Sequence, residues 1–191
     1  SQGNMVTVPE ILDLLEPEVL RYFFALNPRK ARDLDISRLD QLVDDFDRFE
    51  RAYFGDVDDE TLTAFAERAY PFVVDEVRED RVRLPYTFAA VLGMTDDRDL
   101  RIEMARNEGY FDDDTPEWAI EEALERVDRA RAWAERLDNE YNYRIQEDLP
   151  EVDVDDAVAT ALDELAEFVA AGHDGEEIQG EMYETARRHD I

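Results

Sequence analysis

Residues 116–137 read PEWAIEEALERVDRARAWAERL, and this stretch decides the fold class. Pro116 suits the first turn of a helix, where no backbone N–H is needed, and Thr115 before it can cap the helix. Apolar residues then recur every three or four positions, which predicts a long helix that buries one face. The residues of this stripe are Ile120, Ala123, Leu124, Val127, Ala130, Ala134 and Leu137.

Similar signals on both sides predict a mainly α protein made of helical bundle regions. A capping box at Thr7 and Glu10 opens a short helix to Leu15, and Asp58 or Asp59 caps a later one. The other predicted helices span residues 18–26, 39–54, 86–92, 98–107, 155–171 and 175–189. Residues 71–83 mix valines with charges and predict a linker or a short strand, so we place a domain boundary there, between 1–80 and 81–191.

Composition indicates a folded and strongly acidic protein. The 191 residues hold 51 Asp and Glu against 21 Lys and Arg, with Lys30 the single lysine, and the formal net charge is -30. A hydrophobic content of 44% is too high for a disordered acidic tail. Carboxylates spread along the chain are typical of a salt-loving archaeon, because at about 1 M salt a Debye length of about 3 Å screens self-repulsion. An acidic protein from a mesophile is the alternative.

Several classes of protein and site are excluded by what the sequence lacks. It has no cysteine and two histidines, which excludes disulfides and zinc fingers. It has no run of about 20 apolar residues and no visible signal peptide, so we expect a cytoplasmic protein with no membrane partner. It has no phosphate-binding glycine loop and no nucleophile elbow, and Asp112-Asp113-Asp114 lacks the spacing of a calcium loop. We therefore expect no catalytic residue, metal ligand or cofactor in this chain.

Four separated patches resemble one enzyme family. Residues 1–7, SQGNMVT, are similar to the tail of the Lys-Met-Ser-Lys-Ser signature of class I aminoacyl-tRNA synthetases, a mobile loop that contacts ATP phosphates. Residues 17–24, PEVLRYFF, resemble the buried helix that follows this loop. Residues 44–55, and then 146–150 with 175–184, are similar to class I lysyl-tRNA synthetases, the archaeal type. Cysteinyl-tRNA synthetases share the first two patches and are the alternative.

The resemblance implies a C-terminal fragment of a lysyl-tRNA synthetase, which attaches lysine to tRNA(Lys) using ATP and Mg²⁺. Residues 1–80 would be the end of the ATP loop and the connecting, stem-contacting helical subdomain, and residues 81–191 a helical anticodon-binding domain truncated at its C-terminus. Ser1, Gly3 and Asn4 can be carried over as the tail of the ATP loop. The fragment would lack the catalytic domain and bind tRNA as a monomer, with no DNA partner.

Residues that contact RNA are inferred from chemistry alone, because phosphates need cations and unstacked bases need aromatic faces. The densest basic cluster is Arg29, Lys30 and Arg32, in a predicted loop, and pairing with Asp33 and Asp35 is the alternative. Weaker candidates are Arg78, Arg81 and Arg83 at the boundary, Arg126, Arg129 and Arg136 on the long helix, and the aromatic residues Trp118, Trp133 and Tyr110. Local pairing with Glu122 and Glu125, and core packing of the aromatic rings, are their alternatives.

One further alternative is a helical interaction module with no RNA role. The composition fits it equally well, but it gives no reason for the four matching patches. Binding of RNA by so acidic a chain must rest on local basic groups together with shape and stacking. We therefore expect its affinity for tRNA to fall only gradually as the salt concentration rises.

Overall fold

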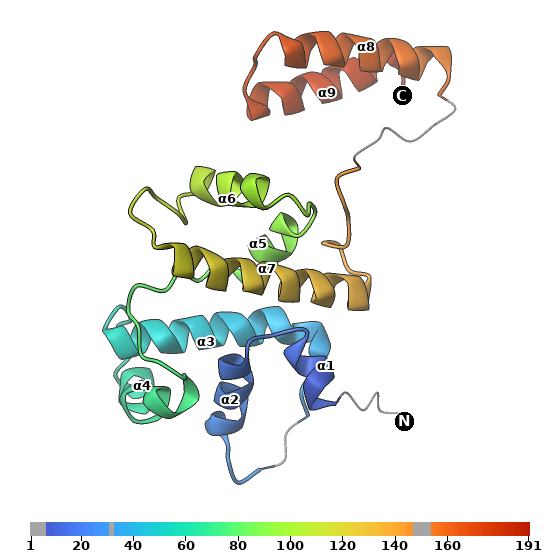
Figure 1. Ribbon diagram of the computed structural model, residues 1–191. Coiled ribbons are helices and arrows are strands. Elements are labelled where there is room, and N and C mark those ends of the chain that lie inside the picture. Colours follow the sequence, from blue (N-terminus) through green and yellow to red (C-terminus); the bar gives the residue numbers. More distant parts are fainter. Residues whose placement is uncertain (1–6, 31–32, 147–153) are drawn as a thin grey trace, which may run out of the picture. The chain divides into compact units, whose positions relative to one another are not determined.

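Helices make up the regular structure of this protein (Figure 1). The computed structural model describes residues 7–30, 33–146 and 154–191. No strand occurs within these ranges, and the mainly α fold class is confirmed. The helices in chain order are α1 (Val8–Leu12), α2 (Pro17–Leu26), the 3-10 turn η1 (Ile36–Arg38), α3 (Leu39–Phe54), α4 (Glu60–Val73), α5 (Tyr86–Leu92), α6 (Arg98–Asn107), α7 (Glu117–Leu137), α8 (Asp156–Ala170) and α9 (Gly175–His189).

Local sequence signals set several helix ends as predicted. Thr7 and Glu10 form the capping box at the start of α1, although this helix ends at Leu12 and not at Leu15. The Asp59 carboxylate accepts a hydrogen bond of 3.0 Å from the Leu62 amide and caps α4. Gly55 ends α3 with a φ of 89°, a conformation that glycine adopts without a steric penalty.

Two local predictions differ from the structure. Of the two alternatives for residues 71–83 the strand is wrong, and the linker begins only at residue 74, because α4 continues through Pro71 to Val73 and residues 74–83 follow without a regular element. The cap predicted at Thr115 is wrong, since Pro116 occupies the N-cap position of α7. The Thr115 hydroxyl instead donates a hydrogen bond of 2.8 Å to the Asp112 carboxylate and closes the turn before the helix. A threonine hydroxyl can bond either a helix N-terminus or a nearby carboxylate, and the sequence alone does not show which bond forms.

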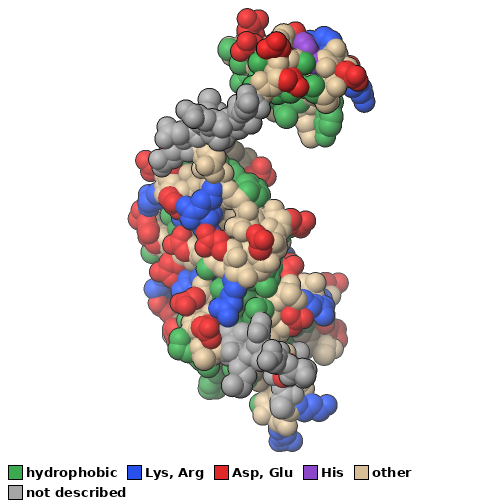
Figure 2. All heavy atoms as spheres, turned by 90° about the vertical axis from the view of Figure 1, so that its right-hand side faces the viewer, with side chains coloured by type: hydrophobic (Ala, Val, Ile, Leu, Met, Phe, Trp, Pro, Cys, Tyr) green, Lys and Arg blue, Asp and Glu red, His purple; other side chains and the backbone are tan. Residues whose placement is uncertain are grey.

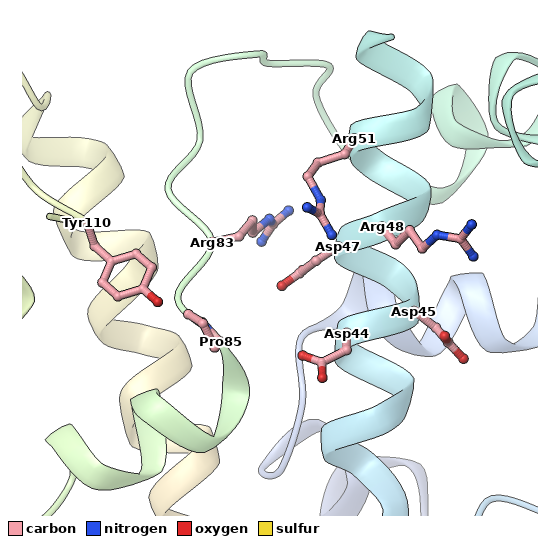
Figure 3. Close-up of a pocket in the computed structure, with 8 residues that line it drawn as sticks. All are labelled: Asp44, Asp45, Asp47, Arg48, Arg51, Arg83, Pro85 and Tyr110. Carbon is pink, nitrogen blue, oxygen red and sulfur yellow. The ribbon is translucent and has the colours of Figure 1, made fainter. Parts of the chain in front are cut away.

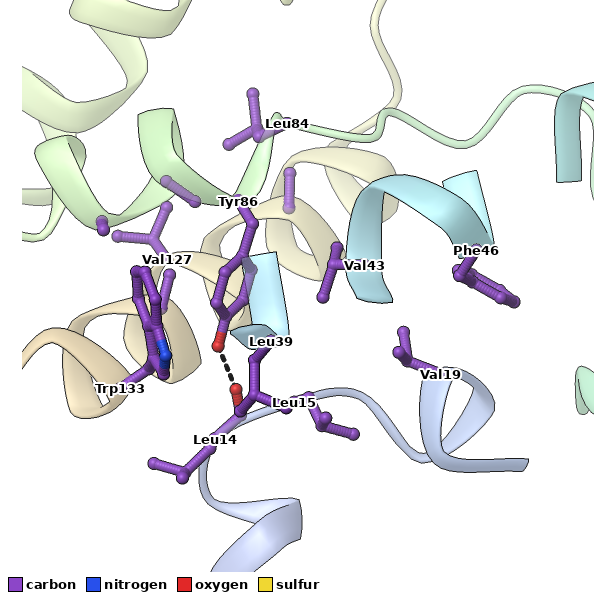
Figure 4. Close-up of a cluster of buried hydrophobic side chains, with 14 of the residues drawn as sticks. Leu14, Leu15, Val19, Leu39, Val43, Phe46, Leu84, Tyr86, Val127 and Trp133 are labelled. Atoms are coloured by element: carbon purple, nitrogen blue, oxygen red, sulfur yellow. Dashed lines mark hydrogen bonds between the residues drawn. The ribbon is translucent and has the colours of Figure 1, made fainter. Parts of the chain in front are cut away.

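Residues up to Ile145 belong to one compact unit, and its core joins both sides of the predicted boundary at residue 80. The helix α5 packs along α7, α3 packs along α4, and α2 contacts both α3 and α4. Figure 4 shows Tyr86 of α5 inside this core, where its hydroxyl donates to the carbonyl of Leu14. Trp133 of α7 donates from its indole nitrogen to the carbonyl of Ile36 at 2.8 Å. Because these bonds cross residue 80, the division into 1–80 and 81–191 remains a prediction about function.

Residues from Gln146 onward belong to a second compact unit, in which α8 and α9 form a helical hairpin. The helices have strong caps of their own, since the carboxylates of Asp155 and Asp174 each accept a backbone amide hydrogen bond of 2.9 Å. Among the described residues of this unit, only Ala161 and Thr185 are fully buried. The hairpin therefore depends more on local helix signals than on a core.

Charges of both signs are interspersed on the face drawn in Figure 2. This agrees with a surface in which acidic residues partner many of the arginines. Within the described ranges, no helix combines the length and the apolar character needed to cross a membrane.

Candidate nucleic-acid interface

Arg126 of α7 is buried, with 1% of its surface exposed, and it sits at the centre of an ionic cluster. Its Nη1 and Nη2 donate to the two carboxylate oxygens of Asp47 at 2.7 and 2.9 Å, and its Nε donates to Glu16. Nη1 also donates to the carbonyl of Leu84 at 2.8 Å. Burial alone would raise the pKa of the Glu16 carboxyl, but the charges of Arg126 and Arg83 outweigh it and hold the pKa below its usual value. Glu16 is therefore ionised, and the cluster joins α7 to α3 and to the segment before α2.

A second cluster lies around Arg83. Its Nε and Nη2 donate to the two oxygens of the Glu50 carboxylate at 2.7 and 3.0 Å, and the Tyr70 hydroxyl donates to the same group. Burial works to raise the pKa of Glu50, and the hydrogen bonds and charge of Arg83 lower it overall. Arg81 is also enclosed, with 8% of its side chain exposed, and its Nε lies 3.3 Å from a Glu122 oxygen. Arg81 and Arg83 are thus engaged with carboxylates of their own protein.

Burial argues against direct RNA contact by two of the predicted residues. Arg126 and Trp133 are 1% and 4% exposed, and their donors already bond protein groups. Arg129 pairs with Glu125 at 3.3 Å, which is the local pairing weighed from the sequence. For Arg126 the expected local partner is wrong, because Glu16 lies 110 positions away and Asp47 lies 79 positions away. Helical spacing reveals neighbours on the same helix but not partners on another.

The basic loop after α2 differs from these enclosed arginines. Arg29 and Lys30 are exposed, and within the described residues neither side chain has an ion pair or hydrogen bond. Neither Arg29 nor Lys30 forms the alternative pair with Asp33 or Asp35, and the Asp35 carboxylate accepts the Ser37 amide at 3.0 Å and caps η1. The remaining predicted positions, Arg32 of this loop and Ser1, Gly3 and Asn4 of the ATP-loop tail, lie outside the described residues.

Two other arginines of the described chain have side chains without an ion pair, hydrogen bond or ring contact, namely Arg51 and Arg106. Sequence analysis missed both of them. Arg51 shares one face of α3 with Asp44 and Asp47, at spacings of seven and four residues, and this polar stripe was the signal that could have revealed it. Unpaired cations are informative in this chain because acidic residues outnumber basic ones 51 to 21.

The polar stripe of α3 forms one wall of a cleft with a volume of about 520 Å³, which we call the α3 cleft (Figure 3). Figure 3 shows Arg83 and Pro85 on the facing segment and Tyr110 across from the helix. The Tyr110 ring stacks on Phe88 with a centroid distance of 5.1 Å, which holds it in place. The lining residues are Asp44, Asp45, Asp47, Arg48, Arg51, Arg83, Pro85 and Tyr110.

The acidic residues of the α3 cleft have different electrostatic settings. The Asp47 carboxylate is paired with the Arg126 guanidinium, which lowers its pKa, but burial has the larger effect and raises the pKa overall. Burial and the charges of Asp47 and Asp40 also raise the pKa of Asp44. Among the aromatic candidates, Trp118 is covered by the Arg78 guanidinium at 4.5 Å from the ring centroid, and Tyr110 alone lines this cleft.

Comparison with known sequences gives the family. Residues 1–73 match the family model described as tRNA synthetases class I (K). Over its full length the chain is 60% identical to a lysine–tRNA ligase from Haloarcula marismortui and 61% identical to one from Natronomonas pharaonis. The chain belongs to the class I lysyl-tRNA synthetase family. This confirms the resemblance found in the four patches.

The chain spans about a third of the length of these lysyl-tRNA synthetase relatives, namely 35% and 36% of the two proteins. A lysine–tRNA ligase from Halobacterium salinarum matches the whole chain at 53% identity. These relatives agree with the halophilic archaeal origin inferred from the charge. They do not support the alternative of a cysteinyl-tRNA synthetase.

Proposed function

We propose that this chain is the tRNA-binding part of a lysine–tRNA ligase that, as a whole protein, attaches lysine to tRNA(Lys) with ATP and Mg²⁺. The observation that carries the proposal is the match over the whole of this chain, at 60% identity, to a lysine–tRNA ligase. In this proposal the chain itself binds tRNA and does not catalyse. The whole enzyme acts as a monomer in the cytoplasm.

The finer division of labour follows the family resemblance. Residues 1–80 connect the catalytic domain to the tRNA stem, with Ser1, Gly3 and Asn4 as the tail of the ATP loop. Residues 81–191 bind the anticodon region. The shared core of α1 to α7 supports this proposal in one respect, because it would hold residues 1–80 and residues 81–145 at a fixed spacing.

The loop containing Arg29 and Lys30 is the first surface we propose for the tRNA backbone. Its side chains are exposed and carry no carboxylate partner within the described residues, so a phosphate can bind them without breaking an existing ion pair. Arg32 extends the same cluster in the sequence. The arginines enclosed around Glu16 and Glu50 would instead keep the fold intact.

High salt allows an acidic protein to bind tRNA at this surface. At about 1 M salt the Debye length is about 3 Å, so the net charge of -30 no longer repels a tRNA at a distance, whereas direct guanidinium–phosphate bonds persist. Affinity should therefore fall far less steeply with KCl concentration than for a basic RNA-binding domain that contacts many phosphates. A steep loss between moderate and molar KCl would contradict this account.

The experiment that tests the proposal is capture of total haloarchaeal tRNA on the full chain in molar KCl, with sequencing of the bound species. We expect enrichment of lysine tRNAs. The double variant Arg29→Gln/Lys30→Gln should weaken binding and lower the slope of log affinity against log salt by about 1.4 to 1.8 if two phosphate contacts are lost.

The matched control is Arg68→Gln/Arg106→Gln, which removes two exposed positive charges elsewhere. Arg68 bonds only the Ala64 carbonyl of its own helix, and Arg106 has no partner among the described residues. Equal weakening by both double variants would assign the effect to net charge and not to the loop. Absence of any tRNA enrichment would overturn the proposed function and favour an interaction module.

A further inference from the structure

The α3 cleft contains polar groups that the fold itself does not use. Most of its charged residues are engaged elsewhere: Asp47 with Arg126, Arg83 with Glu50, and Arg48 with Asp59 at 2.9 Å. Among the residues that the structure describes, the side chains of Arg51, Asp44 and Asp45 remain without an ion pair or hydrogen bond. The cleft thus offers one unpaired guanidinium and unpaired carboxylates in a single hollow.

Arg51 and Arg83 bring two guanidinium groups to one end of the cleft. In Figure 3 their guanidinium groups reach toward each other from α3 and from the facing segment. Arg83 is fixed by its two bonds to Glu50, and the Arg51 side chain has no ion pair within the described part of the chain. Two guanidiniums that converge in this way favour an anion between them, and a phosphate accepts hydrogen bonds from both.

The rest of the cleft suits a flat group that donates hydrogen bonds. Tyr110 lies across from α3 in Figure 3, and stacking on Phe88 holds the orientation of its ring. The Asp44 carboxylate accepts but does not donate when ionised, so its complement is an N–H group. Ring stacking and N–H recognition together are how proteins bind unpaired nucleobases.

We propose that the α3 cleft binds one nucleotide, with its phosphate between Arg51 and Arg83, its base against Tyr110, and a base N–H donated to Asp44. The cleft volume of about 520 Å³ lies in the range of roughly 300 to 1,000 Å³ that is usual for small-molecule sites. An unpaired nucleotide of tRNA and a free nucleotide share this chemistry. The tRNA form of the proposal rests on the proposed function.

The test compares a nucleoside monophosphate, the matching nucleoside and tRNA as ligands of the full chain in molar KCl, by NMR titration and filter binding. Arg51→Gln should weaken monophosphate binding about tenfold, because one charge-assisted hydrogen bond is lost, and leave the nucleoside unaffected. Asp44→Asn should weaken both small ligands. Arg106→Gln, which removes another unpaired arginine outside the cleft, should change neither.

The tRNA arm separates this proposal from the proposed function. If tRNA binding also falls with Arg51→Gln and not with Arg106→Gln, the nucleotide belongs to tRNA. If the small ligands respond while tRNA does not, the cleft is a site for free nucleotides. If none of the ligands distinguishes Arg51→Gln from Arg106→Gln, the cleft proposal is overturned, even where wild-type tRNA binding upholds the proposed function. Arg51 is exposed and unpaired, so its replacement should not disturb folding, and circular dichroism checks this.

Discussion

The unit up to Ile145 and the α8–α9 hairpin place their charged side chains differently. The larger unit encloses arginines and carboxylates together, with Arg126 bonded to Glu16 and Asp47 in its interior. The hairpin keeps its charges outside and has few buried side chains. Leu162, Val169 and Met182 of the hairpin each remain 50% exposed or more.

This difference indicates which interactions stabilise each unit. In the larger unit the enclosed ion pairs of Arg126 and Arg83 cannot be broken without leaving a charge in a place that water hardly reaches, so single changes there should have large effects. In the hairpin, caps and helix propensity matter more, so single changes should have small effects.

Replacing Arg126 should have the largest effect. Arg126→Ala leaves Glu16 and Asp47 without their shared partner and should lower the free energy of unfolding of the larger unit by about 3 to 5 kcal/mol. Urea unfolding followed by the fluorescence of Trp118 and Trp133 measures this unit, because both tryptophans lie within it. Arg106→Ala is the control and should have little effect. Comparable losses in the two variants would contradict a stabilising role of the buried cluster.

Replacing Glu50 should have a smaller effect that depends on pH. Glu50→Gln removes the charged acceptor of Arg83 and should cost about 1.5 to 3 kcal/mol at neutral pH. The pKa of Glu50 is lowered in the folded state, so its ionised form stabilises the protein above its usual pKa of 4.5, and this contribution is lost as the pH falls through the folded value. The difference from wild type should be constant above about pH 4.5 and shrink below it. The control is Glu67→Gln, which removes one carboxylate at an exposed site of α4 and should change the free energy of unfolding little at neutral pH.

Adding a methyl group at Gly93 should test the close packing of α5 on α7. A Cβ there would lie 2.8 Å from the Cβ of Arg131, a position that cannot move without shifting the helix. Gly93→Ala should therefore cost about 1 to 3 kcal/mol in urea unfolding. The control is Gly180→Ala in α9, where a Cβ meets nothing within 4 Å. That variant should stabilise its helix, and a loss there would show that the hairpin is packed more tightly than its burial indicates.

Removing a cap should have the smallest effect, confined to the hairpin. Asp155→Ala removes the acceptor of the Val158 amide and should destabilise α8 by about 0.5 to 2 kcal/mol. Faster hydrogen exchange of the first turn of α8, with no change in α7, is the expected result. Asp163→Ala removes an equal charge from the middle of α8 and should leave that turn unchanged. Spread of the effect to α7 would contradict independent units.

The sequence predicted the helices well because their signals are local. The stripe from Leu39 to Gly55 and the cap at Asp59 each depend on residues within a turn or two, and the structure agrees with them. The site was predicted less well, because whether a cation is enclosed depends on distant partners. Arg126 and Arg29 look alike in the sequence as basic residues near acids, yet one is buried with Glu16 and the other is exposed without a partner among the described residues.

The family resemblance supplied what local patterns could not. Residues 1–7 and 44–55 indicated a synthetase before any contact was known, and the relatives confirm it. Arg51 lies inside the second of these patches, but the resemblance carried no role for it. Most of its charged neighbours in the α3 cleft form ion pairs within the protein, whereas the Arg51 side chain has none among the described residues.

The span of the Arg126 cluster also bears on how the chain folds during synthesis. Glu16 and Asp47 precede their cationic partner by 110 and 79 residues, so a growing chain holds both acids without it until α7 has been made. Contacts across such separations form slowly, whereas α8 and α9 meet through a short local turn. When residues 81–191 are removed, residues 1–80 should therefore remain unfolded or only loosely collapsed, and stable folding of this unit must await the arginine that closes the cluster.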